Sequence, residues 1–158
     1  MISLEVDIDK QMLTVLDNGK ILRSYLVSTA KNGAGEMINS EKTPRGTHVI
    51  RAKIGEGEAV NTVFVGRRPT GEVYSQALRA QFPDRDWILT RIFWLSGKEQ
   101  GLNRFGEVDT MKRYIYIHGT PDDVLMGFPG SRGCIRMRNS EIIELFNTVP
   151  AGTQVTIK

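Results

Sequence analysis

Short runs of alternating apolar and polar residues dominate this chain and restrict it to a fold built mainly from β-strands. The first run alternates Ile2, Leu4, Val6 and Ile8 with polar residues, which is the period of a strand with one buried face. Similar runs predict further strands at residues 12–16, 21–27, 48–54, 62–65, 87–95, 114–117 and 153–157. Many short strands indicate a mainly β, sandwich-like domain.

One hairpin and one helix carry local signals. Asn18-Gly19 separates the first two of these further runs, and this pair favours a type I′ turn because both positions need positive φ. Asn139 or Ser140 can cap a helix that has an apolar face and is followed by Pro150 and Gly152. We therefore expect one or two short helices, with irregular structure at residues 29–42, 66–86 and 96–112.

Length and charge exclude several classes of protein. A chain of 158 residues fits a single domain over 1–158, and we expect a monomer. Net charge is +3, from 21 basic and 18 acidic residues, and no dense basic run argues for nucleic acid. No apolar run approaches the ~20 residues of a membrane span. A single cysteine allows no disulfide within the chain.

The segment from His118 to Met137 holds the strongest chemical signal. It contains the only cysteine, Cys134, and one of two histidines, His118. A cysteine and a histidine that meet in the fold form a nucleophile and its base. Arg132 and Arg136 flank Cys134, and such cations lower the pKa of a thiol. The alternative is a small buried cysteine and a histidine satisfied by the backbone.

These residues resemble the catalytic motif of the L,D-transpeptidases, the YkuD-like cell-wall enzymes. The motif is a His-Gly at a strand end, a loop, and then Ser/Thr-His-Gly-Cys followed by an apolar residue and Arg or Asn. This chain has His118-Gly119, then Ser131-Arg132-Gly133-Cys134, Ile135 and Arg136. Upstream, the run 42–47 (KTPRGT) resembles the family's Thr-Pro-x-Gly turn. Arg132 departs from the pattern, because the family usually has a second histidine there.

The resemblance implies a role for each motif residue. Cys134 would be the nucleophile and His118 its base, held in one tautomer by the carbonyl of Gly119. The N–H groups of Gly133 and Cys134 are candidates for an oxyanion hole. The resemblance calls for neither a cofactor nor a metal.

Three further residues are candidates for substrate binding: Ser131, Arg132 and Arg136. Ser131 could instead orient the turn or the histidine, and Arg136 could be a structural ion-pair partner. We expect Arg132 to reach outward to substrate rather than toward the sulfur.

Other features have simpler interpretations. His48 lies in a Thr-His-Val-Ile run and is predicted to be structural or exposed. Asp122 and Asp123 are expected to face solvent in the loop 119–130, which is either a lid over the site or an ordinary loop packed on the core. Two histidines and one cysteine, widely spaced, do not form a zinc site.

The implied activity is cell-wall crosslinking. Cys134 would attack the carbonyl between the third residue of a peptidoglycan stem, a diamino acid, and the terminal D-alanine, and an amine would then take the acyl group. Carbapenem-type β-lactams would acylate the same cysteine. Two alternatives are a hydrolase, such as a carboxypeptidase or amidase, on the same site, and an inactive peptidoglycan-binding module.

The same resemblance implies a location in the periplasm or cell envelope. The N-terminal residues MISLEVDIDKQ lack the basic and apolar regions of a signal peptide. A cytoplasmic protein and a shortened chain therefore both remain open.

Overall fold

A computed structural model describes all of residues 1–158 and contains mainly β-strands. The strands are β1 (Ile2–Asp7), β2 (Met12–Asp17), β3 (Lys20–Leu26), β4 (Gly46–Ile54), β5 (Thr62–Val65), β6 (Arg68–Val73), β7 (Ile88–Gly97), β8 (Tyr116–Thr120), β9 (Ile135–Arg138) and β10 (Gln154–Ile157). The helices are α1 (Gln76–Gln81), the 3-10 turn Gly106–Val108 and α2 (Asn139–Thr148). None of them is long and apolar enough to cross a membrane.

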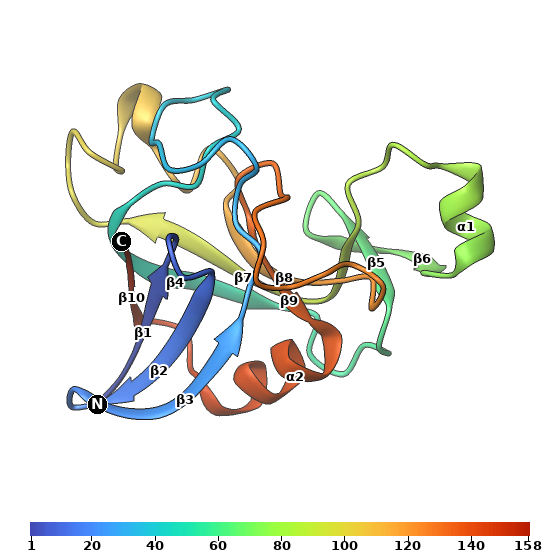
Figure 1. Cartoon of the computed structure of the whole chain (residues 1–158), viewed down its shortest axis with the longest axis horizontal. Helices are drawn as coiled ribbons and strands as arrows, with labels where there is room; N and C mark the ends of the chain where they lie inside the picture. Colours follow the sequence, from blue (N-terminus) through green and yellow to red (C-terminus); the bar gives the residue numbers. More distant parts are fainter.

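All ten strands belong to one hydrogen-bonded sheet, which curls around α2 (Figure 1). The main path runs β3-β2-β1-β10-β4-β7-β5-β6, and β8 branches from β7 to pair with β9. The mainly β class is therefore confirmed. The two layers expected of a sandwich-like domain belong to one continuous curled sheet. β5, β6 and α1 form an arm on the far side of β7 from the N-terminal strands (Figure 1).

The core fills the inside of the curl. Alternate residues of most strands point inward, including Leu4 and Val6 of β1 and Phe93 and Leu95 of β7. α2 closes the core with the apolar side chains of Ile142, Leu145 and Phe146. Burial of these groups, at about 25 cal/mol per Å² of apolar surface removed from water, holds the sheet in its curl.

The local predictions mostly hold. Asn18 and Gly19 both have positive φ, +49° and +84°, as a type I′ turn between β2 and β3 requires. The expected irregular stretch 66–86 was wrong, because it contains β6 and α1. Its strand pattern is weak because the side chains of β6 are largely exposed, so no apolar alternation marks it.

The start of α2 also differs from the prediction. Arg138 is the N-cap residue, and its side chain makes no capping hydrogen bond. The Asn139 side chain instead accepts from Thr90 Oγ1 at 2.6 Å and donates to Asn61 Oδ1 and Asp122 Oδ1. A tertiary network therefore uses the amide that local capping rules would assign to the helix end.

Candidate active site

Strand alternation places His118 and Cys134 on the same face of the sheet. β8 and β9 are parallel, with Ile117 opposite Ile135 and His118 opposite Arg136. Ile117 and Ile135 point into the core. Because side chains alternate along a strand, His118, Cys134 and Arg136 point to the outer face.

The imidazole of His118 is fully buried and held by a single hydrogen bond. Its Nδ1 lies 2.6 Å from the carbonyl oxygen of Gly119, the contact that the resemblance implied. A carbonyl only accepts, so Nδ1 carries the proton and Nε2 presents its lone pair. Nε2 is buried and has no hydrogen-bond partner.

Burial keeps this histidine neutral. It lowers the pKa of His118, and the positive charge of Arg136 acts in the same direction, against the carboxylate of Asp86 and the Gly119 carbonyl. A neutral imidazole with one free, buried nitrogen has the properties of a general base.

The sulfur of Cys134 lies against β8. Sγ accepts from the backbone N–H of Tyr116 at 3.3 Å and lies 3.5 Å from the carbonyl oxygen of Tyr114. His118 lies two residues beyond Tyr116 on the same strand, and no hydrogen bond joins its Nε2 to Sγ.

The thiol is protonated in the resting protein. Burial raises the pKa of Cys134 to about 12, although the Tyr116 N–H and the guanidinium groups of Arg136 and Arg113 act to lower it. The expected lowering of this pKa by flanking cations was therefore wrong in its net direction. Desolvation of a thiolate outweighs the two cations, and Arg132 contributes nothing to the shift.

The turn before Cys134 is held by its own hydroxyl. Ser131 Oγ donates to the Cys134 carbonyl at 2.5 Å and accepts from the Gly133 N–H at 3.2 Å, so Ser131 orients the turn rather than the histidine. Gly133 has a φ of +132°, which disfavours any side chain. Of the two amides proposed for an oxyanion hole, the Gly133 N–H is thus engaged, whereas the Cys134 N–H makes no hydrogen bond.

The two arginines of the motif take different positions. Arg132 is exposed and its Nη2 donates to the carbonyl oxygen of Asp84 at 2.9 Å. Arg136 is mostly buried, pairs with Asp86 at 3.4 Å and donates to the Gly130 carbonyl at 3.1 Å. Arg136 thus has the ion pair considered above as an alternative to substrate binding.

A cleft of about 470 Å³ opens beside Cys134. Arg67, Arg113 and Arg132 line it with the aromatic rings of Tyr114 and Tyr116, and Asp86 supplies the carboxylate. Arg67 stacks on the Tyr114 ring at 4.6 Å and donates to the Tyr116 hydroxyl at 3.0 Å. Arg113 is fixed by donating to the Lys42 carbonyl at 2.6 Å. The cleft carries more positive than negative charge.

Sequence reasoning missed Arg67 and Asp86, because both lie in the stretch that was expected to be irregular. No local pattern distinguishes them from other surface charges. Thr43 was also missed as a site residue, although the Thr-Pro motif marks it. Its hydroxyl donates to the Gly133 carbonyl at 2.9 Å and accepts from the Ala30 N–H, which joins this turn to the cysteine turn.

Hydrogen bonds hold the loop 119–130, which follows β8, against the segment after β3. The Gly127 N–H donates to the Val27 carbonyl at 2.9 Å, and Ser28 Oγ donates to the Phe128 carbonyl at 2.7 Å. Met126 is buried, whereas Leu125 and Phe128 are 74% and 63% exposed. Only part of the loop's apolar surface therefore packs on the core.

The remaining polar candidates are placed as follows. Asp122 and Asp123 are exposed and accept from Asn139 and Arg79. His48 is fully buried, with Nε2 2.9 Å from Thr110 Oγ1 and Nδ1 3.0 Å from the Gly46 carbonyl. It lies in β4, and it is structural rather than exposed.

The sequence matches the profile of the L,D-transpeptidase catalytic domain over residues 2–157. The chain belongs to the YkuD family of L,D-transpeptidase catalytic domains. A Bacillus licheniformis relative named for the YkuD L,D-transpeptidase is 48% identical over 145 residues, which cover 89% of this chain and 61% of the relative. The chain thus spans about three fifths of that relative's length.

Solved structures agree with the fold. L,D-transpeptidase 3 from Mycobacterium tuberculosis, in complex with a faropenem-derived adduct, superposes with a TM-score of 0.60 at 15% identity, covering 99% of this chain and 60% of that chain. The L,D-transpeptidase LdtMt1, in complex with imipenem, gives 0.59 at 20% identity, covering 99% and 58%. β-Lactams are therefore bound by proteins of this fold, and the mainly β curled sheet is that of an L,D-transpeptidase catalytic domain.

Proposed function

We propose that this chain is a cysteine acyltransferase that acts on peptidoglycan stem peptides, with Cys134 as nucleophile and His118 as base. The observation that carries the proposal is the buried, unpartnered Nε2 of His118, fixed by Gly119 on the same sheet face as the only cysteine. A buried polar atom without a hydrogen-bond partner lowers the stability of the fold, and a catalytic role explains why such an atom is kept.

The first half of the reaction forms a thioester. Sγ attacks the carbonyl carbon between the third stem residue and D-alanine while its proton passes to Nε2 of His118. Because both groups are neutral at rest, proton transfer accompanies formation of the S–C bond rather than preceding it. The free Cys134 N–H stabilises the oxyanion, and the imidazolium then returns its proton to the nitrogen of the departing D-alanine.

The second half reverses these roles. The amine of a second stem attacks the thioester carbonyl, His118 takes a proton from that amine, and the sulfur leaves with the proton as a thiol. The product is an amide that joins two stems. Neither step requires a cofactor.

The charge of the cleft supports an anionic substrate. Stem peptides carry carboxylates, and guanidinium groups bind carboxylates through two parallel hydrogen bonds. Arg67, Arg113 and Arg132 present three such groups beside the sulfur. We propose action in the cell envelope, where this polymer is found.

The test is to incubate the protein with disaccharide-tetrapeptide stems and follow D-alanine release and crosslinked dimers by mass. The parent should release D-alanine and form dimers, and Cys134→Ala and His118→Gln should lose both. His48→Gln is the matched control, because it removes the other histidine, and it should keep the activity while folded. Release by Cys134→Ala would refute the proposal.

Two other results would assign one of the alternatives. D-Alanine release without dimers, at high acceptor concentration, would identify a hydrolase on the same site. No release and no imipenem adduct with the folded parent would identify an inactive binding module.

A further inference from the structure

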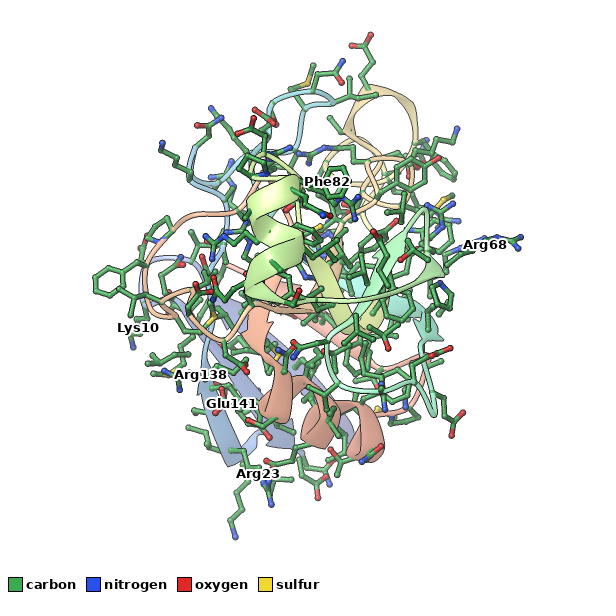
Figure 2. The ribbon with its side chains drawn as sticks, turned by 90° about the vertical axis from the view of Figure 1, so that its right-hand side faces the viewer. Lys10, Arg23, Arg68, Phe82, Arg138 and Glu141 are labelled. Carbon is green, nitrogen blue, oxygen red and sulfur yellow. The ribbon has the colours of Figure 1, made fainter.

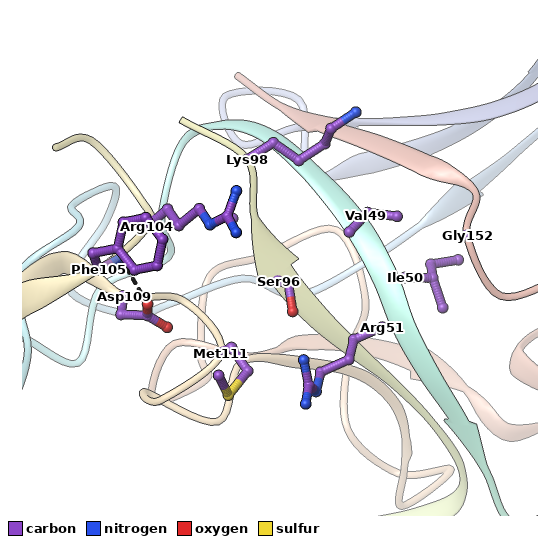
Figure 3. A pocket seen from close by; sticks show the side chains of 11 residues that line it. Val49, Ile50, Arg51, Ser96, Lys98, Arg104, Phe105, Asp109, Met111 and Gly152 are labelled. Carbon is purple, nitrogen blue, oxygen red and sulfur yellow. Dashed lines mark hydrogen bonds between the residues drawn. The ribbon is translucent and has the colours of Figure 1, made fainter. Parts of the chain in front are cut away.

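A second cavity of about 520 Å³ lies on the outer face of the sheet, over β4 and β7, and shares no lining residue with the Cys134 cleft. The segment from Lys98 to Met111 contributes five of its lining residues, and Figure 3 shows Arg104, Phe105 and Asp109 together at one side of it. Its volume falls within the range of about 300–1,000 Å³ that is usual for small-ligand sites. The reaction proposed above makes no use of this cavity.

Three cations line the cavity, and none has an acidic partner. Arg51, Lys98 and Arg104 take part in no ion pair and in no side-chain hydrogen bond. Six arginines elsewhere in the chain form ion pairs, so Arg51 and Arg104 belong to the arginines whose charge no carboxylate neutralises. Their charges converge on one concave surface, where they attract an anion.

The only carboxylate of the cavity is already occupied. Asp109 Oδ2 accepts from the Phe105 N–H at 2.7 Å, and Oδ1 accepts from the Lys112 N–H at 3.0 Å. Asp109 is buried, and these two hydrogen bonds shape the segment from Lys98 to Met111. Its carboxylate therefore holds the backbone and leaves the three cations free.

A hydrogen-bond donor without a partner lies within the same cavity. Ser96 Oγ is buried and makes no hydrogen bond. Figure 3 shows this hydroxyl between the side chains of Arg104 and Phe105 on one side and Arg51 on the other. An oxyanion in the cavity would accept from Ser96 and pair with the guanidinium groups.

Trp94 separates the cavity from the catalytic cleft. It lies two residues before Ser96 on β7, and its Nε1 donates to the Met111 carbonyl at 3.2 Å. Arg51 stacks over its ring at 5.2 Å and Arg67, which lines the cleft, at 4.7 Å. The two hollows are thus neighbours on one face, with a packed aromatic wall between them.

We propose that this cavity is a second, non-catalytic binding site for an oxyanion, a carboxylate or phosphate group of a ligand whose apolar part contacts the exposed ring of Phe105. Binding there would hold an anionic ligand on the face that also opens to Cys134. The inference does not depend on the acyl-transfer reaction.

The test uses Cys134→Ala protein, so that no covalent chemistry takes part. Inorganic phosphate and succinate are titrated separately, and the backbone amides of residues 96–111 are followed by NMR. At least one probe should give saturable shifts in this segment. Saturation with phosphate alone assigns a phosphate group, and saturation with succinate alone assigns a carboxylate group.

The paired variants separate a built site from general surface charge. Arg51→Gln/Arg104→Gln should raise the Kd about tenfold or more, the equivalent of one lost charged hydrogen bond. Lys10→Gln/Arg68→Gln removes the same charge from side chains that lie at opposite edges of the molecule (Figure 2) and should leave the Kd within about twofold. Equal weakening in both pairs, or no saturable shift with either probe, would overturn the proposal.

Discussion

The protonated state of Cys134 gives a sharp prediction for thiol reactivity. With a pKa of about 12, the thiolate fraction at pH 7.5 is about 3 × 10⁻⁵, whereas an ordinary thiol of pKa ~8.5 is about one-tenth ionised. The thiolate fraction of Cys134 is thus about three thousandfold lower than that of an ordinary thiol. A more basic thiolate is more nucleophilic by about 30–50-fold over this difference in pKa, which leaves a net deficit of about a hundredfold.

The assay is alkylation by iodoacetamide, followed by intact mass from pH 6 to 10. The single cysteine makes each added mass unambiguous, and the same chain unfolded in guanidinium chloride is the matched control. The folded protein should react about a hundredfold more slowly at pH 7.5, and its rate should rise tenfold per pH unit without a plateau. A plateau between pH 6 and 9 would show a resting thiolate–imidazolium pair and refute the reasoning.

His48, Gly119 and Arg132 each allow a further test of stability or kinetics. Burial lowers the pKa of His48 to about 4, so its contribution to the free energy of unfolding is complete above pH 6.5 and falls by about 3 kcal/mol as the pH drops to 4. Urea unfolding of His48→Gln should show a smaller loss of stability over the same pH range. An equal loss would contradict this assignment. Gly119→Ala should destabilise the fold by about 1–3 kcal/mol, because the new Cβ would lie 2.6 Å from a backbone carbonyl oxygen. The control Gly130→Ala, whose Cβ would meet only ordinary contacts, should change the stability by less than about 0.5 kcal/mol. Similar unfolding midpoints in urea would show that the strand adjusts to the added methyl group at little cost. Arg132→Ala should raise KM for stem peptides about three- to tenfold. It should leave kcat and the pH dependence of alkylation unchanged, since this cation does not act on the thiol. A shifted pH profile of alkylation would instead place the Arg132 guanidinium at the sulfur.

Local patterns predicted most of the secondary structure and the chemical residues. Period-two alternation marked the strands that form the core face, since each of them has one buried side. Weakly patterned elements were missed, because β6 exposes most of its side chains and α1 buries none of its residues. The motif around Cys134 marked the nucleophile and the turn that Ser131 stabilises.

The charge environment of the site could not be predicted in the same way. Arg67 approaches Cys134 only because β5 and β6 fold back beside β7, and Asp86 because the segment after α1 returns to the sheet. Arg67 and Asp86 are separated from Cys134 by dozens of residues in sequence, and no short-range pattern predicts that they line the same cleft. The free cations of the second cavity arise in the same way, from β4 and from the segment after β7.

The sequence by itself determined which residues can do chemistry and which face of each strand they occupy, because side-chain type and alternation are local properties of the chain. The tertiary structure decided their protonation. Whether flanking arginines or burial sets the pKa of the Cys134 thiol depends on how much protein surrounds the sulfur. The parallel pairing of β8 with β9 determines that burial. Desolvation depends on atoms from every part of the fold, so it appears only once the chain has folded.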